Sequence, residues 1–148
     1  MRGMGLGIGL HALGHRSGEG DRDYKQLYTM LRKQHFEFIA GLIQRLESVP
    51  EGDGTMMDNT VIVYTSDAAE THHSSGNEWP FVLIGNLGGR LRTGRLIEYP
   101  AFGDQGNRST NALYCSLLHA ADRPRNHFNL EGATKEVDVQ GPLNELLT

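Results

Sequence analysis

Hydrophobic residues recur at helical spacing over one long stretch of the chain, from Tyr24 to Val49. They fall at intervals of four or seven, as one face of an α-helix requires, and they are Leu27, Leu31, Phe38, Leu42 and Leu46, with Ile39 and Ile43 beside them. Asp23 is placed to cap the start of this helix, and Pro50 prevents its continuation. The pattern predicts a helix over residues 24–48 that covers one face of a sheet.

Two runs rich in β-branched, aromatic and aliphatic residues follow, and they predict strands at about residues 60–66 and 81–85. The polar link between them has no helical pattern and is short for a parallel crossover, which favours a mixed sheet. A shorter run, Leu96–Tyr99, is closed by Pro100 and predicts a further short strand.

The last regular pattern is again helical, from a capping residue at Ser109 to Ala121. Cys115 lies inside this pattern and is interpreted as a core residue rather than a nucleophile. The tail after Arg123 is polar apart from three leucines, and we expect it to fold against the main body; the leucines are Leu143, Leu146 and Leu147. The predicted fold is α/β, as one domain over residues 1–148, a usual domain size.

Composition excludes several classes of function. The net charge of −4 lacks the basic excess that a nucleic-acid surface needs, so no nucleic-acid partner is expected. No stretch approaches the roughly 18–20 apolar residues of a membrane span, and a single cysteine excludes an internal disulfide. A basic glycine-rich segment, with Arg90, Arg92 and Arg95, is interpreted as a solvated turn, although such a turn could also meet an anion.

The candidate chemistry follows the first predicted strand, where a polar loop contains Asp67, Glu70, His72 and His73. Ligands of open α/β sheets bind just beyond the carboxyl ends of strands, and carboxylates with imidazoles are typical ligands of a divalent metal. An ordinary loop with solvated charges accounts for the same composition.

A second pair of imidazoles, His11 and His15, is spaced to share one helix face. We expect this pair to approach the loop, which would give a joint site for Zn²⁺ or Mn²⁺ rather than Mg²⁺. No nucleotide cofactor is expected. His35 lies on the apolar stripe of the long helix and is interpreted as a packing residue.

Several segments together resemble the carboxy-terminal half of the bacterial HXXSHH-motif family, whose function is not assigned. The segments are HALGHR at residues 11–16, the long helix, the strand with its histidine loop, WPFVLIGNLGGRLRTGRLIEYP, and the last helix with LLHA. The resemblance covers about residues 5–130 and is most specific over 50–100. The naming motif departs at Gly14, where the family has Ser, and at Arg16, where it has the last His.

That family in turn resembles the alkaline phosphatase and sulfatase superfamily of metal-dependent hydrolases. The resemblance implies that Asp67 is the strand-end metal ligand, with Ala68 in place of the expected His, and that His72 or His73 is the later ligand. His11 and His15 match the remaining pair, with His replacing Asp. The nucleophile and the first acidic ligand would lie upstream of Met1, so the chain is expected to be a carboxy-terminal fragment whose partner is the missing amino-terminal half.

Two functional hypotheses follow from the resemblance. The first is part of an exported hydrolase, periplasmic or secreted, that acts on small anionic phosphate or sulfate esters. The second is a non-catalytic binding or structural relative with degenerate metal ligands. Ala68, Gly14 and Arg16 favour the second, and the retained histidines with Asp67 favour the first.

Overall fold

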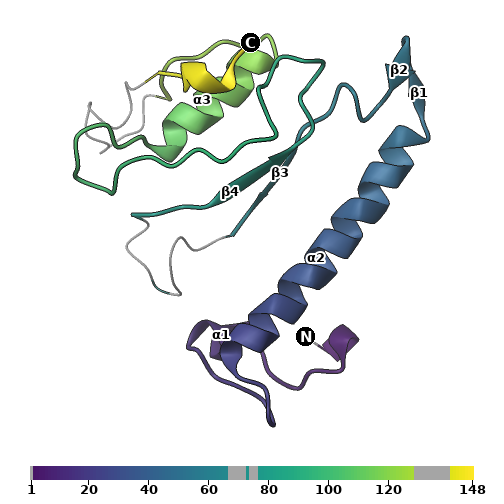
Figure 1. The fold of residues 1–148 in the computed structure, drawn as a ribbon, viewed down its shortest axis with the longest axis vertical. Coiled ribbons are helices and arrows are strands. Elements are labelled where there is room, and N and C mark those ends of the chain that lie inside the picture. Colours follow the sequence, from purple (N-terminus) through teal and green to yellow (C-terminus); the bar gives the residue numbers. More distant parts are fainter. Residues whose placement is uncertain (1, 67–72, 74–76, 129–140) are drawn as a thin grey trace.

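A computed structural model gives the structure of this chain and describes residues 2–66, 73, 77–128 and 141–148. The described part is α/β, with helices and small antiparallel sheets (Figure 1). Its elements are η1 (Arg2–Met4), α1 (Leu10–Gly14), α2 (Tyr24–Glu47), β1 (Pro50–Glu51), β2 (Gly54–Thr55), β3 (Ile62–Thr65), β4 (Phe81–Ile84), α3 (Thr110–Ala120) and η2 (Asn144–Leu146).

The long helix α2 begins at the residue that the sequence predicts. The Asp23 carboxylate accepts a hydrogen bond from Gln26 N at 2.8 Å, and the Gln26 side chain accepts one from Asp23 N at 3.0 Å. This reciprocal pair is a capping box, which satisfies amide groups that the first helical turn leaves without partners. Ser48 forms the carboxy-terminal cap, two residues before Pro50. The predicted helix is confirmed.

The strands β3 and β4 form an antiparallel pair in which Ile62 faces Ile84 and Thr65 faces Phe81. Both predicted strands are confirmed, in slightly shorter form. Within the described residues both sheets are two-stranded and antiparallel, so the predicted mixed sheet is not seen there. The link between the strands is too short for a crossover, and it returns the chain to the neighbouring strand instead.

The two faces of this hairpin contact different helices (Figure 1). On one face, the Tyr64 ring lies 5.0 Å from the Phe36 ring of α2, and its hydroxyl lies 3.2 Å from His35 Nδ1. On the other face, Phe81 and Leu83 pack against the hydrophobic cluster built on α3. Because side chains alternate between the faces of a strand, the hairpin forms a thin middle layer between α2 and α3. His35 is the packing residue that its position predicts.

The apolar stripe of α2 is only partly covered by the described residues. Leu27 is fully buried, whereas Phe38 is 68% exposed and Leu42 is 45% exposed. The predicted cover of the sheet by α2 therefore does not extend to these two residues. The contact with the hairpin is made by the rings of His35, which lies on the stripe, and of Phe36 beside it.

Helix α3 carries the larger hydrophobic cluster and is closed by the carboxy-terminal tail. Ser109 caps the helix, and Cys115 inside it is fully buried, as its position predicts. The cluster contains Ala112, Leu113, Leu143 and Leu146. The buried Ser116 hydroxyl donates to Ala112 O at 2.8 Å and accepts from Leu143 N at 2.7 Å, which joins the tail to the helix. The expected docking of the tail is confirmed.

The strand predicted at Leu96–Tyr99 is absent, because these described residues pair with no other strand. Ile97 and Tyr99 pack against the α3 cluster, while Leu96 is 83% exposed. The alternation of buried and exposed side chains in this run therefore reflects an extended segment with one face buried. Such a segment has the side-chain period of a strand without the ladder of backbone hydrogen bonds.

Tyr99 also fastens this segment to the tail through its hydroxyl, which donates to Glu145 Oε1 at 2.5 Å. Burial, together with this bond to a carboxylate, raises the pKa of Tyr99 well above its usual value. The same bond holds the pKa of Glu145 below its ordinary value of 4.5. The two shifts have one cause, since the bond is strongest between a neutral phenol and a charged carboxylate.

We predict that Tyr99→Phe lowers the free energy of unfolding by about 1 kcal/mol near neutral pH, a modest figure because solvent reaches the pair. A carboxyl whose folded pKa is depressed contributes stability above its unfolded pKa and loses it as pH falls through the folded value. The difference between wild type and variant should therefore shrink on acidification below about pH 4.5. Urea unfolding of both proteins from pH 7 to pH 3 measures it, and a pH-independent difference would contradict the assignment.

Candidate metal centre

The short helix α1 positions two of the predicted histidines, and one buried leucine fixes that helix. Leu13 is fully buried, in a cluster with Leu6 and Leu27, so α1 packs on the first turns of α2. His11 and His15 lie four residues apart, which places both on one side of α1. Both are exposed, with ring centroids 4.7 Å apart.

A third histidine, His73, reaches this pair from the segment between β3 and β4. Its ring centroid lies 6.0 Å from that of His11 and 5.5 Å from that of His15. The backbone of His73 has a φ of 56°, which is a left-handed conformation. This conformation is energetically unfavourable for residues other than glycine. Two segments far apart in the sequence thus meet through three imidazoles.

The spacing of the three histidines is close to what a bound metal ion requires. Each offers one ring nitrogen, and these three atoms lie within 4.8 Å of one another. Three nitrogens bound to one zinc ion at about 2.0–2.1 Å lie about 3.4 Å apart in a tetrahedral arrangement. Small rotations of the exposed side chains span the difference, so the residues fit such an ion. Three protein ligands would leave one coordination position open, as in catalytic zinc sites.

The remaining predicted ligands cannot be placed beside this group. Asp67, Glu70 and His72 lie outside the described residues, as does Ala68. Of the six predicted site residues, the structure brings together His11, His15 and His73. The six share no sequence motif that spans both segments, and the contact arises from tertiary packing.

The sequence marks Arg16 only as a departure from the HXXSHH motif. Two backbone hydrogen bonds end α1, from Arg16 N to Leu13 O at 2.9 Å and from Ser17 N to Ala12 O at 3.1 Å. This is a Schellman motif, and it places Arg16 in the left-handed position that glycine usually fills. Because Gly14 stands two residues earlier, the sequence contains no local signal for this end point.

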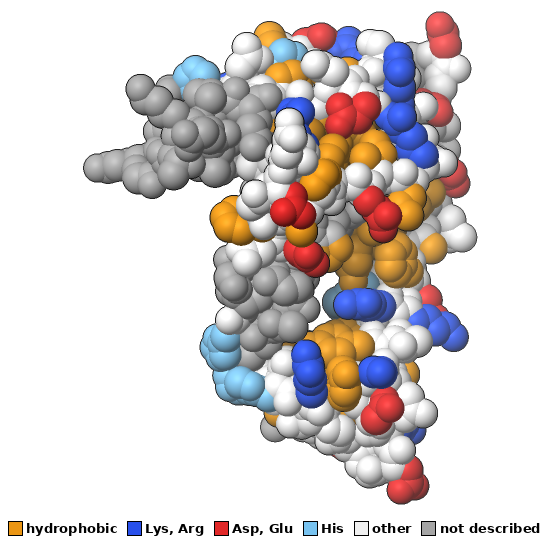
Figure 2. Space-filling view, turned by 60° about the vertical axis from the view of Figure 1, so that its left-hand side comes forward, with side chains coloured by type: hydrophobic (Ala, Val, Ile, Leu, Met, Phe, Trp, Pro, Cys, Tyr) orange, Lys and Arg blue, Asp and Glu red, His pale blue; other side chains and the backbone are white. Residues whose placement is uncertain are grey.

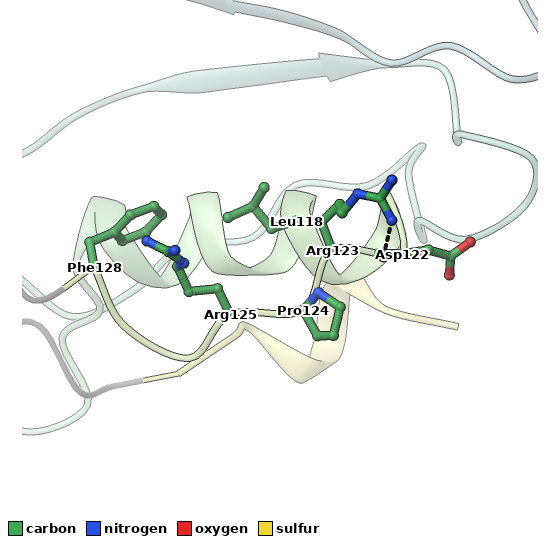
Figure 3. A pocket seen from close by; sticks show the side chains of 6 residues that line it. All are labelled: Leu118, Asp122, Arg123, Pro124, Arg125 and Phe128. Atoms are coloured by element: carbon green, nitrogen blue, oxygen red, sulfur yellow. Dashed lines mark hydrogen bonds between the residues drawn. The ribbon is translucent and has the colours of Figure 1, made fainter.

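A candidate site of another type lies along α3 and the segment that follows it (Figure 3). A hollow of about 480 Å³ is lined there by Leu118, Asp122, Arg123, Pro124, Arg125 and Phe128. Its cations are already engaged, since Arg123 donates to the Asp122 carbonyl at 3.4 Å and Arg125 lies 5.8 Å from the centre of the Phe128 ring. The hollow is open, and the group of possible metal ligands found among the described residues does not include its lining, so the histidines remain the stronger candidate.

Comparison of the chain with protein-family models, with curated proteins and with solved structures finds no match. Among the described residues, no helix combines the length and the apolar character that crossing a membrane requires.

We predict that Leu13→Ala lowers the free energy of unfolding by about 2–5 kcal/mol, because it removes a fully buried side chain and leaves a cavity beside Leu27. Leu10→Ala is the matched control on the same helix, and it should change little because Leu10 is 61% exposed. Chemical denaturation of both variants measures the difference. Equal effects would contradict the claim that Leu13 fixes α1.

Proposed function

We propose that His11, His15 and His73 bind one divalent transition metal ion, with zinc preferred. The observation that carries the proposal is the meeting of three imidazole nitrogens from two distant segments within 4.8 Å. Neutral imidazole suits zinc, copper and nickel, whereas manganese and magnesium favour carboxylate and carbonyl oxygens. Zinc is therefore favoured over manganese if the histidines are the main ligands.

We propose further that this centre serves metal-dependent hydrolysis of small phosphate or sulfate esters. The resemblance to the HXXSHH-motif family, and through it to the alkaline phosphatase and sulfatase superfamily, supports this class and an alkaline-phosphatase-like fold. It also supports a role outside the cytoplasm, in a periplasmic or secreted protein. A metal ion bound there would supply a Lewis acid for the ester oxygen and lower the pKa of water. The histidines of this chain would hold and orient that ion at the surface.

A second candidate function is metal binding without catalysis. Gly14, Arg16 and Ala68 depart from the motifs that the resemblance would require. A non-catalytic relative would keep the histidines and bind metal, and it would show no turnover. Both candidate functions therefore predict metal binding, but only the hydrolase predicts ester hydrolysis.

We expect isothermal titration to detect one bound zinc ion per wild-type chain, and His73→Ala to weaken it by about 100-fold or more. Removal of a residue that binds the metal directly should weaken affinity more than removal of a group that only hydrogen-bonds a ligand, which costs roughly 10–100-fold. His11→Ala and His15→Ala should act alike. His127→Ala is the matched control, because this exposed histidine lies outside the group.

Affinity should also fall as pH is lowered from about 7.5 to about 5.5, since protons compete with the metal for imidazole. Equal zinc binding by wild type and His73→Ala, or a loss in His127→Ala of the same size, would overturn the assignment of the ligands.

For hydrolysis, we expect the zinc-loaded chain to release nitrophenol from p-nitrophenyl phosphate or p-nitrophenyl sulfate faster than free zinc does, with zinc-bound water as the nucleophile. Turnover should be lost in His73→Ala and retained in His127→Ala, because the metal is the Lewis acid of the reaction. Tight zinc binding without turnover above that of free zinc would reject catalysis by zinc-bound water in this chain and favour the non-catalytic relative.

A further inference from the structure

The apolar stripe of α2 is covered along its first half and exposed along its second half. Leu27 is fully buried and Leu31 is partly buried, where α1 and the amino-terminal segment pack on the helix. Phe38 and Leu42 continue the same stripe at helical spacing, and their exposed fractions are 68% and 45%. Figure 1 shows this second half of α2 at the edge of the molecule. Exposed apolar side chains that adjoin one another mark surfaces of interaction.

A glycine lies in the middle of this exposed half. Gly41 is inside the helix, where glycine is less favourable than alanine because it loses more conformational freedom on folding. A Cβ built on Gly41 would meet no other group within 4 Å, the backbone of the helix itself excepted. Packing within the chain therefore gives no reason for a glycine here. Gly41 lies three residues after Phe38 and one before Leu42, so it opens a gap beside both, into which another helix could pack closely.

Two opposite charges stand at equal distances on either side of Gly41. Glu37 lies four residues before it and Arg45 four residues after it, and both are exposed. They are too far apart along the helix to pair with each other, since helical neighbours are three or four residues apart. Glu37 accepts a hydrogen bond from the Gln34 side chain at 3.3 Å, and the ion pair found among the described residues lies elsewhere, at the end of α3. Within that part of the chain, Glu37 and Arg45 are therefore available to an ion-pair partner from outside.

We propose that the exposed half of α2 binds the same surface of a second copy of this chain, with the two helices antiparallel and a two-fold axis beside Gly41. In a two-fold contact, residue i of one copy meets residue j of the other, and residue j meets residue i. With the axis beside Gly41, Glu37 of each copy meets Arg45 of the other, which gives two ion pairs. Phe38 and Leu42 of both copies form the apolar centre between these pairs.

The charge pattern also selects the orientation of the two helices. A parallel pair would place Glu37 opposite Glu37 and Arg45 opposite Arg45, and like charges across an interface are unfavourable. The antiparallel pair replaces both repulsions by attractions. Because exposed ion pairs contribute little free energy, the apolar contact supplies most of the affinity, and the charges fix direction and register.

The candidate metal centre lies outside this contact. Leu27, where α1 packs, is about 20 Å along the helix from Gly41. Antiparallel helices therefore place the two α1 segments at opposite ends of the dimer. Figure 2 shows exposed histidine side chains toward the lower end of the molecule, which is the end that carries α1 in Figure 1. Association of the two copies is therefore independent of zinc.

Sedimentation equilibrium from about 1 to about 100 μM, a range in which interfaces of modest size associate, tests the proposal in EDTA and again with zinc. We expect the same monomer–dimer equilibrium in both. Phe38→Ala should weaken the dimer by about tenfold or more, because binding energy concentrates in aromatic residues at the centre of an interface. Phe102→Ala is the matched control, since this phenylalanine is 63% exposed in the loop before α3, and it should leave the equilibrium unchanged.

Exchange of the two charges tests the antiparallel register. Glu37→Arg alone and Arg45→Glu alone each place like charges opposite one another, so each should weaken the dimer. The double variant with Glu37→Arg and Arg45→Glu restores opposite charges and should recover most of the wild-type affinity, as a double-mutant cycle of a direct contact requires. Circular dichroism of each variant checks that the helix is retained.

A wild-type chain that stays monomeric over this range, or that forms a dimer with zinc alone, would overturn the inference. Growth into ever larger assemblies would also overturn it, because a two-fold contact closes at two copies. The same holds for equal affinity in wild type and Phe38→Ala, an equal loss in Phe102→Ala, or no recovery in the double variant. Absence of zinc binding would overturn the proposed metal site and leave the dimer in EDTA unaffected.

Discussion

Burial of Leu13 against Leu27 is the contact on which the candidate site depends. The helix α1 has five residues, too few to be stable in isolation, and it has no side-chain hydrogen bond at its amino-terminal cap. Its shape is kept because one leucine enters the cluster at the start of α2. The same packing turns His11 and His15 outward on the opposite side. A hydrophobic contact thereby sets the direction of two polar side chains.

The third histidine depends on a different contact, at the middle of α2. Tyr64 lies against His35 and Phe36, which fixes the β3–β4 hairpin beside the helix. The end of β3 and the start of β4 form the end of the hairpin nearest α1 (Figure 1), and His73 lies between these two strands in the sequence. Helix α2 therefore contacts both α1 and the hairpin, and these two contacts hold the end of the hairpin close to α1. The second hydrophobic cluster, on α3, supports the hairpin from its other face.

The polar group that results is exposed and carries backbone strain at two positions, His73 and Arg16. Exposure makes the imidazoles accessible to an ion, and strained backbone persists only where the surrounding packing enforces it. A metal ion bound by residues from both segments would also close the long loop between them, and this would stabilise the folded chain. Binding and folding are therefore expected to be coupled at this site.

Local patterns in the sequence determined the two main helices, their caps at Asp23 and Ser109, the two central strands and the interior position of Cys115. These features depend on neighbours within a few residues, so periodicity and capping chemistry suffice to predict them. The strand predicted at Leu96–Tyr99 is wrong, because an extended segment with one buried face shows the same alternation of residues whether or not it pairs with a strand. The pattern also failed to predict the exposure of Phe38 and Leu42, which depends on how α2 is rotated against the hairpin.

For the candidate site, the sequence determined which side chains could bind a metal, since imidazole chemistry is a property of the residue. It also determined that His11 and His15 lie together, because four residues make about one helical turn. Only the tertiary structure decided that His73 joins them and that Arg16 occupies a left-handed position beside them. Both depend on contacts between segments distant in the chain, such as Leu13 with Leu27 and Tyr64 with Phe36. No local pattern of residues encodes such contacts.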